Sequence, residues 1–325
     1  MKKNSDSFNV SHLKLEDIKK YIKKFKEISY KLEKNFIRYT EIYNHNPEIR
    51  DISFCVKTKD NTIYCPLTLF NKESPEISFY NYPVEIFSEK KIDEELNQFL
   101  NKKLNDIKKQ NKVKNICFKV KKNNIINNEN RLENLEKIVS DIYISLNLSH
   151  LEIQSNFKQS LRTILRKKYD TLEYQIIDKE NYEKNEILKM REMHLIVSGR
   201  ETRSKESWVQ NERMILDGNA FIVKATFDNK PISYSFFYLN EITCFYLSSC
   251  SLREYFKTLK NITHSSLWHA IVYAKKKCDY FYIGSTTVYS KKKILEKEVN
   301  IDKFKKQFSL EGEEYCIFND IPNFF

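Results

Sequence analysis

Glycine is scarce in this chain, with 4 residues in 325, and there are only 6 Pro and 2 Trp. No apolar run approaches the ~20 residues that a membrane-spanning helix needs. The first ten residues, MKKNSDSFNV, carry two Lys with no apolar block after them. We therefore expect neither a signal peptide nor a membrane span.

The seven Cys are odd in number, scattered, and never spaced as C-x-x-C. This pattern argues against a disulfide framework and against zinc ligation. Most of the Cys fall in strand-like apolar runs, where a free Cys is usually a small buried hydrophobe. We expect no metal, and a reducing, cytoplasmic compartment.

Apolar residues and positive charge are plentiful. The chain is 41% hydrophobic and 14% aromatic, which favours a folded protein, and its length favours two domains. The formal net charge of +12 favours anionic partners such as nucleotide phosphates, coenzyme A, tRNA or an acidic membrane surface.

Apolar periodicity predicts the elements of the N-terminal part. In order, these are one helix through Ile18–Phe36, strands over 51–58 and 62–70, a helix over 92–107, a strand over 113–121 and a polar linker over 121–131. The tyrosines Tyr64, Tyr80 and Tyr82 of this part are candidates for lining a cleft between domains.

The C-terminal part is predicted to continue with a basic amphipathic helix over 156–169 and a strand over 171–178. Helices over 183–197 and 205–216 follow, with a break at Gly199–Thr202. Next come strands over 219–227, 230–239 and 241–249, a helix over 263–276, a strand over 279–285, a helix over 300–308 and a strand over 313–318.

Three blocks in this part carry a resemblance. They are MHLIVSGRETRS (193–204) followed by Trp208 and Gln210, THSSLWHAIVYAKKKC (263–278) and EKEVNIDKFKKQF (296–308). With the order of elements, they resemble the FemAB-like branch of the GNAT acyltransferase superfamily. They are similar above all to GNAT-like proteins of amino-sugar gene clusters for surface glycans and flagellar glycosylation. The resemblance covers about residues 150–315.

The resemblance implies an α/β (α+β) fold with tandem GNAT-like domains, whose mixed, mostly antiparallel sheets are flanked by helices. The N-terminal domain would span residues 1–147. The C-terminal, FemAB-like acyltransferase domain would span residues 148–325. The N-terminal domain shares only the architecture.

The implied function is transfer of an acyl group from acyl-coenzyme A (acetyl-CoA or longer) to the amine of a nucleotide-linked amino sugar. No Cys or Ser stands in a nucleophile motif, so the amine would attack directly in a ternary complex. One alternative is an aminoacyl-tRNA-dependent enzyme of the peptidoglycan-precursor type. Another is a non-catalytic module that binds a nucleotide sugar or a partner. No DNA partner is expected.

One departure from the wider superfamily bears on the donor. The glycine-rich pyrophosphate loop is absent, because residues 250–262, CSLREYFKTLKNI, contain no Gly. Such a loop offers backbone N–H groups to coenzyme A phosphates at a helix N-terminus. Its absence leaves both acyl-coenzyme A and aminoacyl-tRNA open as donors.

Several residues in the matched blocks are predicted to bind substrate. Arg200 and Arg203 offer planar guanidinium groups suited to phosphate, with Thr202 between them. The alternative for these two arginines is surface pairing with Glu201 or Glu206. Trp208 would stack on a base or pack in the core. Lys297, Glu298 and Lys305 are predicted to contact the acceptor, the alternative being a solvated helix face.

Removing a proton from the attacking amine needs a base whose pKa lies near neutrality. His264 and His194 lie in matched blocks and are the histidine candidates. Glu201 is the catalytic carboxylate candidate, and Glu298 is a further one. The alternative for each histidine is a packing or capping role.

Overall fold

The structure, a computed structural model, describes residues 8–12, 15–22, 25–26, 29–44, 48–71, 74–88, 90–124, 134–260, 262–309 and 311–322. We call residues 1–147 the first half and residues 148–325 the second half. This division remains our proposal, and residue 147 lies in the turn that follows strand β9 (Leu135–Ser145).

The first half combines short strands with three α-helices in its described residues. Its elements are β1 (Asn9–His12), α1 (Leu15–Ile22), a 3₁₀ turn (Ser29–Leu32), α2 (Lys34–Tyr43), β2 (Glu48–Asp51), β3 (Phe54–Lys57), β4 (Thr62–Cys65), β5 (Thr68–Asn71), β6 (Glu76–Ser78), β7 (Phe87–Ser88), α3 (Glu94–Gln110), β8 (Phe118–Lys121), a 3₁₀ turn (Lys122–Asn124) and β9.

The second half has longer strands. Its elements are α4 (His150–Ser155), α5 (Gln159–Leu165), β10 (Leu172–Ile177), α6 (Glu186–Ser198), α7 (Lys205–Leu216), β11 (Ala220–Phe227), β12 (Lys230–Leu239), β13 (Thr243–Ser251), a 3₁₀ helix (Arg253–Lys257), α8 (Ile262–Ala274), β14 (Tyr280–Ser290), α9 (Glu296–Lys305) and β15 (Glu313–Phe318).

Local sequence signals account for several of these elements. The Asp93 side chain accepts the Leu96 N–H at 2.9 Å and so caps the start of α3, as an N-cap carboxylate does. Ser204 accepts the Ser207 N–H at 3.3 Å at the start of α7. The β11–β12 hairpin turns at Asp228 and Asn229, which both have positive φ, as its tight turn requires.

Within the described residues, the strands form three sheets. The main sheet has the order β10-β11-β12-β13-β14-β9-β15-β8, and the smaller ones are β1-β3-β4-β7 and β2-β5-β6. All neighbouring pairs of the main sheet are antiparallel except β13 and β14. The predicted mixed, mostly antiparallel fold is therefore confirmed.

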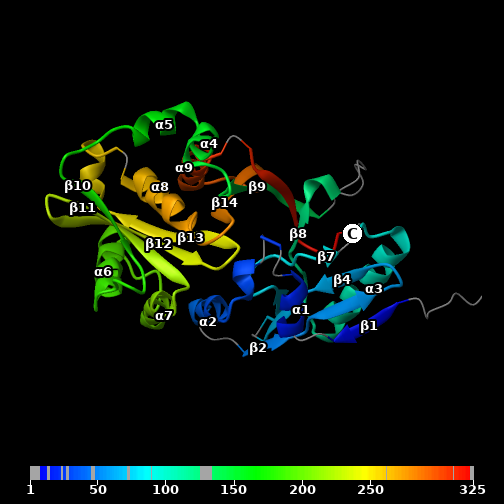
Figure 1. Cartoon of the computed structure of the whole chain (residues 1–325). Coiled ribbons are helices and arrows are strands. Elements are labelled where there is room, and N and C mark those ends of the chain that lie inside the picture. The colour runs from blue at the N-terminus through cyan, green and yellow to red at the C-terminus, as the bar shows by residue number, and fades with distance from the viewer. Residues whose placement is uncertain are drawn as a thin grey trace, which may run out of the picture.

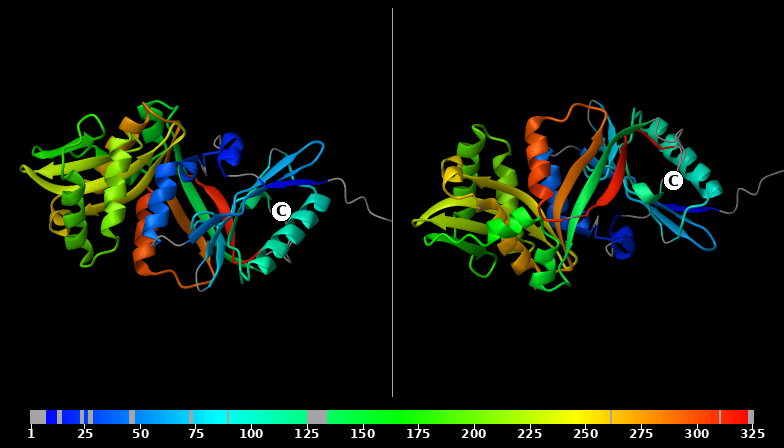
Figure 2. Two further views of the ribbon diagram at one scale, coloured as in Figure 1. Left: turned by 90° about the horizontal axis from the view of Figure 1, so that it is seen from below. Right: turned by 90° about the horizontal axis from the view of Figure 1, so that it is seen from above.

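The last strand, β15, joins the two halves. It lies between β8 and β9 of the first half and is antiparallel to both (Figure 1). Cys316 and Phe318 pack in the same core as Leu100 and Leu104 of α3. The views from below and above show β15 beside β9 where the halves meet (Figure 2). The two halves thus share one sheet.

Helices cover both faces of the second half of this sheet. Alternation along β11 sends Phe221 and Val223 toward α8 and Ile222 toward α6 and α7, since successive side chains of a strand point to opposite faces. Figure 1 shows α8 on one side of β12 and β13, with α6 and α7 on the other.

The predicted continuous helix over 18–36 is wrong, because α1 and α2 are separate and a 3₁₀ turn lies between them. The side chains of Tyr30 and Lys31 in that turn are buried, at 2% and 4% exposure, and Tyr30 stacks on Phe245 of the second half at 4.7 Å. Tertiary packing here overrides the helical periodicity.

Two further sequence predictions differ from the structure. The predicted strand over 62–70 is two strands, β4 and β5, with Pro66 between them, since Pro cannot donate to a sheet ladder. Strand β9 was not predicted, although it is central to the main sheet. The predicted linker over 121–131 falls mostly outside the described residues.

Candidate active site

A cavity opens where β13 and β14 diverge. The two strands pair only over Thr243–Phe245 and Tyr280–Tyr282. Further along, a bulge in the β12–β13 register leaves Leu247 without a partner residue on β12, which bends β13. The resulting cavity measures about 1480 Å³ and is lined by both strands, the start of α8, α9 and parts of the first half.

The wall of this cavity is strongly cationic. Its basic side chains are Lys31, Lys119, Lys137, Arg253, Lys260, Lys297 and Lys305, whereas Glu296 is the acidic one. A concave, low-dielectric surface with charge of one sign concentrates the opposite charge. The cavity therefore suits an anionic ligand, and its volume is large enough for two substrates together.

Lys305 lies at the end of α9, half-buried against β14. Its Nζ donates to the Ser285 carbonyl at 2.9 Å. Burial lowers the pKa of the Lys305 amine, and the carboxylates of Asp302 and Asp141 partly oppose this shift. Gly284 makes room for the amine, since a Cβ there would lie 2.7 Å from Nζ.

His264 reaches the same cavity from the first turn of α8. Its ring packs on Phe304 and Phe308, with centroids at 4.7 and 5.9 Å. Burial lowers the pKa of the imidazole to about 4, and Nε2 has no hydrogen-bond partner among the residues that the structure describes. A neutral ring with this pKa is a weak base at neutral pH.

The predicted cluster at the α6–α7 hinge lies elsewhere. His194, Arg200, Glu201, Thr202 and Trp208 line a separate small depression with Arg191 and Leu195. Glu201 pairs with Arg191 at 2.7 Å, and burial followed by the Arg203 charge lowers the pKa of His194. The structure thus brings these five residues together but does not place them on the large cavity.

Arg203 connects the hinge to the cavity wall. Its Nη1 donates to the Ser248 hydroxyl of β13 at 3.1 Å, and Ser248 lines the cavity. The guanidinium carbon also lies 5.4 Å from the ring centroid of Trp208. Trp208 is buried, with 3% exposure. Arg203 is therefore held beside the diverging end of β13.

The two remaining predicted residues lie at the start of α9. Lys297 is exposed and lines the cavity. Glu298 accepts the Leu295 N–H at 2.9 Å, which caps the first turn of the helix. Of the ten predicted site residues, the structure places His264, Lys297 and Lys305 on the large cavity.

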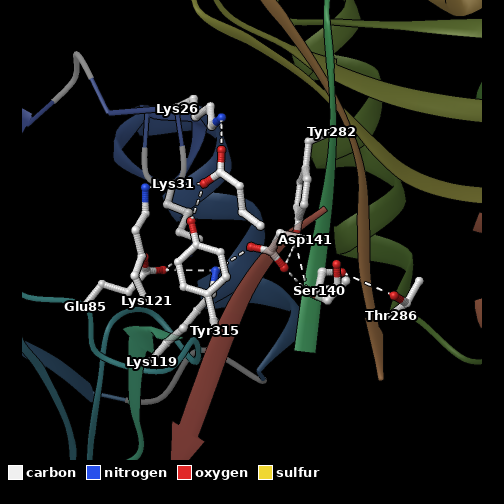
Figure 3. A network of polar contacts seen from close by, with 12 residues as sticks. Lys26, Lys31, Glu85, Lys119, Lys121, Ser140, Asp141, Tyr282, Thr286 and Tyr315 are labelled. Carbon is white, nitrogen blue, oxygen red and sulfur yellow. Dashed lines mark hydrogen bonds and ion pairs between the residues drawn. The ribbon is translucent and has the colours of Figure 1, made fainter. Parts of the chain in front are cut away.

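The first half also supplies site residues. Of the three tyrosines predicted to line a cleft, Tyr82 lies on the cavity wall, whereas Tyr64 and Tyr80 pack in a different core. Tyr30, Lys31 and Lys119, which the sequence did not reveal, line the cavity as well. Beneath the wall, Lys119 and the buried Asp141 form an ion pair at 2.6 Å (Figure 3). In the sequence, the one signal for this ion pair was Asp141, a single carboxylate within the mostly apolar segment IVSDIYIS (138–145).

Among the described residues, no group of three or more His, Cys, Asp and Glu is placed to hold a metal ion. Across the same segments, no helix combines the length and apolar character needed to cross a membrane.

Solved structures match almost the whole length of the chain. FemX aligns with a TM-score of 0.60 at 11% identity, over 95% of this chain and 96% of FemX. A tandem GNAT protein from the clavulanic acid biosynthesis pathway aligns with a TM-score of 0.51 at 8% identity, over 96% and 97%. The chain has a tandem GNAT fold.

This tandem GNAT fold is also similar to that of a conserved protein of unknown function from Bacteroides thetaiotaomicron. That protein has a TM-score of 0.53 and 12% identity, over 96% of this chain and all of that one. No protein-family model matches the chain, and no curated protein matches its sequence. At such identities the likeness concerns the fold, so the activity must be argued from the site.

Proposed function

We propose that this protein is an N-acyltransferase whose acyl donor is carried on a phosphorylated group. The observation that carries the proposal is the cationic cavity between β13 and β14, with the amine of Lys305 inside it. Attack of an amine on an acyl carbonyl places negative charge on the carbonyl oxygen, and a preorganised cation stabilises that charge.

In this mechanism, Lys305 acts in its protonated form beside the reacting carbonyl. The acceptor amine attacks the carbonyl carbon, the oxyanion forms near Lys305, and the donor's thiolate or hydroxyl leaves as the carbonyl is restored. The acceptor nitrogen gives up one proton to solvent or to the leaving group. Both substrates are bound together, which supplies proximity and orientation.

The donor's phosphates are assigned to the mouth of the cavity. Arg253 and Lys260 precede α8 and are exposed on the cavity wall, and Lys297 starts α9. Arg253 and Lys260 fall within residues 250–262, the segment that would correspond to the glycine-rich loop of the wider superfamily, so charge would replace backbone N–H donors there. We propose acyl-coenzyme A as donor and a nucleotide-linked amino sugar as acceptor.

A second combination of donor and acceptor also has support. Residues 250–262 contain no Gly, a feature that the resemblance to the FemAB-like branch accounts for. In this alternative an aminoacyl ester of tRNA is the donor and a peptidoglycan precursor is the acceptor. The same cavity charges would contact the phosphates of the RNA acceptor end.

The experiment offers the purified protein acyl-coenzyme A with an amino-sugar nucleotide, and separately aminoacyl-tRNA with a peptidoglycan precursor. Product formation by mass spectrometry identifies the pairing. Lys305→Met is expected to lower kcat by about 10²–10³-fold. Lys303→Met, on the exposed side of α9, is the control and should retain activity. Binding of either donor without turnover would instead indicate a non-catalytic binding module.

A further inference from the structure

Asp141 is an ionisable group buried completely inside the main sheet. It lies on β9 with 0% exposure. Its Oδ1 accepts the Ser285 hydroxyl at 2.5 Å and the Tyr282 hydroxyl at 3.2 Å. Its Oδ2 accepts Lys119 Nζ at 2.6 Å. Figure 3 shows the carboxylate between Lys119 and Tyr282, with Tyr315 on the Lys119 side.

A buried carboxylate needs such partners, because an unpaired charge away from water costs several kcal/mol. Lys119 of β8, also in the first half, supplies the balancing charge. Burial alone would lower the pKa of Lys119, but Glu85 and Asp141 outweigh it and raise that pKa. Lys119 therefore keeps its positive charge at neutral pH.

Ser285 connects this pair to the cavity. Its hydroxyl is held by Asp141, while its carbonyl accepts Lys305 Nζ at 2.9 Å. One residue therefore binds the buried carboxylate with its side chain and the cavity amine with its main chain. The preceding residue, Gly284, has φ +111, a backbone conformation that glycine adopts readily and residues with a Cβ rarely adopt.

We propose that Asp141 is a positioning residue for Lys305, acting through Ser285, and that Lys119 holds Asp141 in place from the first half. The first half thereby sets the place and the charge of the amine in the second half. The inference rests on the proposed function only where it concerns activity, since the position of Lys305 can be measured without a substrate.

Charged and titratable groups face Lys305 from several elements. Asp302 comes from its own helix, Asp141 from β9 and Tyr282 from β14, and Lys119 and His264 also line the cavity. Removing the negative charge of Asp141 removes one of the two carboxylate charges that favour the protonated amine. Lys305 should then lose its proton at a lower pH.

The test compares the wild type with Asp141→Asn and Ser285→Ala. Competitive labelling with acetic anhydride, followed by mass spectrometry, reports the reactivity of Lys305 against pH. In Asp141→Asn the midpoint is expected to move to lower pH, and in Ser285→Ala the labelling of Lys305 should increase at a fixed pH. Glu186→Gln, which removes a buried carboxylate that is bonded to Lys189 and Tyr234 and not to Ser285 or Lys119, is the matched control and should leave the Lys305 midpoint in place.

Activity gives the second readout. Asp141→Asn should lower kcat by about 10–100-fold, as misplacement of a reacting group does, and move the alkaline limb of the pH–rate profile to lower pH. If Asp141→Asn does not fold, Asp141→Asn with Lys119→Met removes both charges together. Unchanged labelling of Lys305 in both the Asp141 and Ser285 variants overturns the proposal. Changed labelling with unaltered turnover supports the positioning role and overturns the catalytic role of Lys305.

Discussion

Gly284 and Lys305 form a contact that a single methyl group would disrupt. A Cβ on Gly284 would lie 2.7 Å from Lys305 Nζ, and φ is +111 there. Gly284→Ala should therefore displace the amine, lower kcat about 10-fold or more, and cost about 1–3 kcal/mol of stability through backbone strain. Steady-state kinetics and thermal melting measure the two effects.

Gly218→Ala is the control for this variant. Gly218 also has positive φ, +77, but its Cβ would meet the flexible side chain of Lys179 at 3.1 Å. The Gly218→Ala variant should lose about as much stability as Gly284→Ala and keep the wild-type kcat. An equal loss of kcat in the two variants would contradict a specific contact between residue 284 and Lys305.

His264 offers a prediction about pH. Burial lowers the pKa of its imidazole to about 4, so the folded state disfavours its protonated form. Stability from this residue is full above its unfolded pKa near 6.5 and declines as pH falls toward 4. NMR titration should show a neutral ring between pH 5.5 and 8. A midpoint near 6.5 would contradict this and restore His264 as a base.

Residues in the motif blocks were easier to predict than those outside them. Lys297, Lys305 and His264 were selected from the resemblance, and the structure places them on one cavity. Lys119 and Asp141 were not predicted, because a Lys in a Lys-rich chain carries no signal and the strand containing Asp141 was not recognised. Long-range pairing of charges across a sheet has no local sequence pattern.

Helix α9 carries Lys305 at one end and a cap at the other. Glu298 accepts the Leu295 N–H, so Glu298→Gln should weaken the start of the helix by about 0.3–1 kcal/mol. We expect a small fall in Tm and nearly unchanged kcat. Glu296→Gln, which removes a charge in the same turn without a cap bond, should lower Tm less. Lost activity at unchanged Tm would assign Glu298 to substrate binding.

Elements with strong periodicity and clear boundaries were predicted well. Helix α7 matches its prediction residue for residue, and β15 does also, because Ser204 marks the helix start and apolar residues fill the strand. Strand β9 was missed because its apolar residues are interrupted by Lys137, Ser140 and Asp141. Two of these residues also support the site, since Lys137 lines the cavity and Asp141 pairs with Lys119 beneath the cavity wall.

At the scale of the whole molecule, the shared sheet predicts a single unfolding transition. β15 pairs with β8 and β9, and aromatic stacking of Tyr30 on Phe245 joins the halves again. Calorimetric and van't Hoff enthalpies should therefore agree. Two resolved transitions would show that the halves are independent units.

A chain ending at residue 309 should fail to fold in both halves, although it lacks no residue of α9 or of the cavity wall contributed by β13 and β14. Far-UV circular dichroism and proteolysis measure this. Restoring residues 310–325 as a separate peptide should recover folded protein. Native-like protection of the truncated chain would contradict the structural role given to β15.

Strand β15 fills the gap between β8 and β9, although the whole of the second half up to residue 312 separates it from them in sequence. The edges of β8 and β9 stay open while the ribosome translates the long segment that separates them from residues 313–318. Pairing across such a sequence separation is slow. Nascent protein therefore completes its main sheet only after residues 313–318 leave the exit tunnel, and until then the exposed edges are open to chaperones.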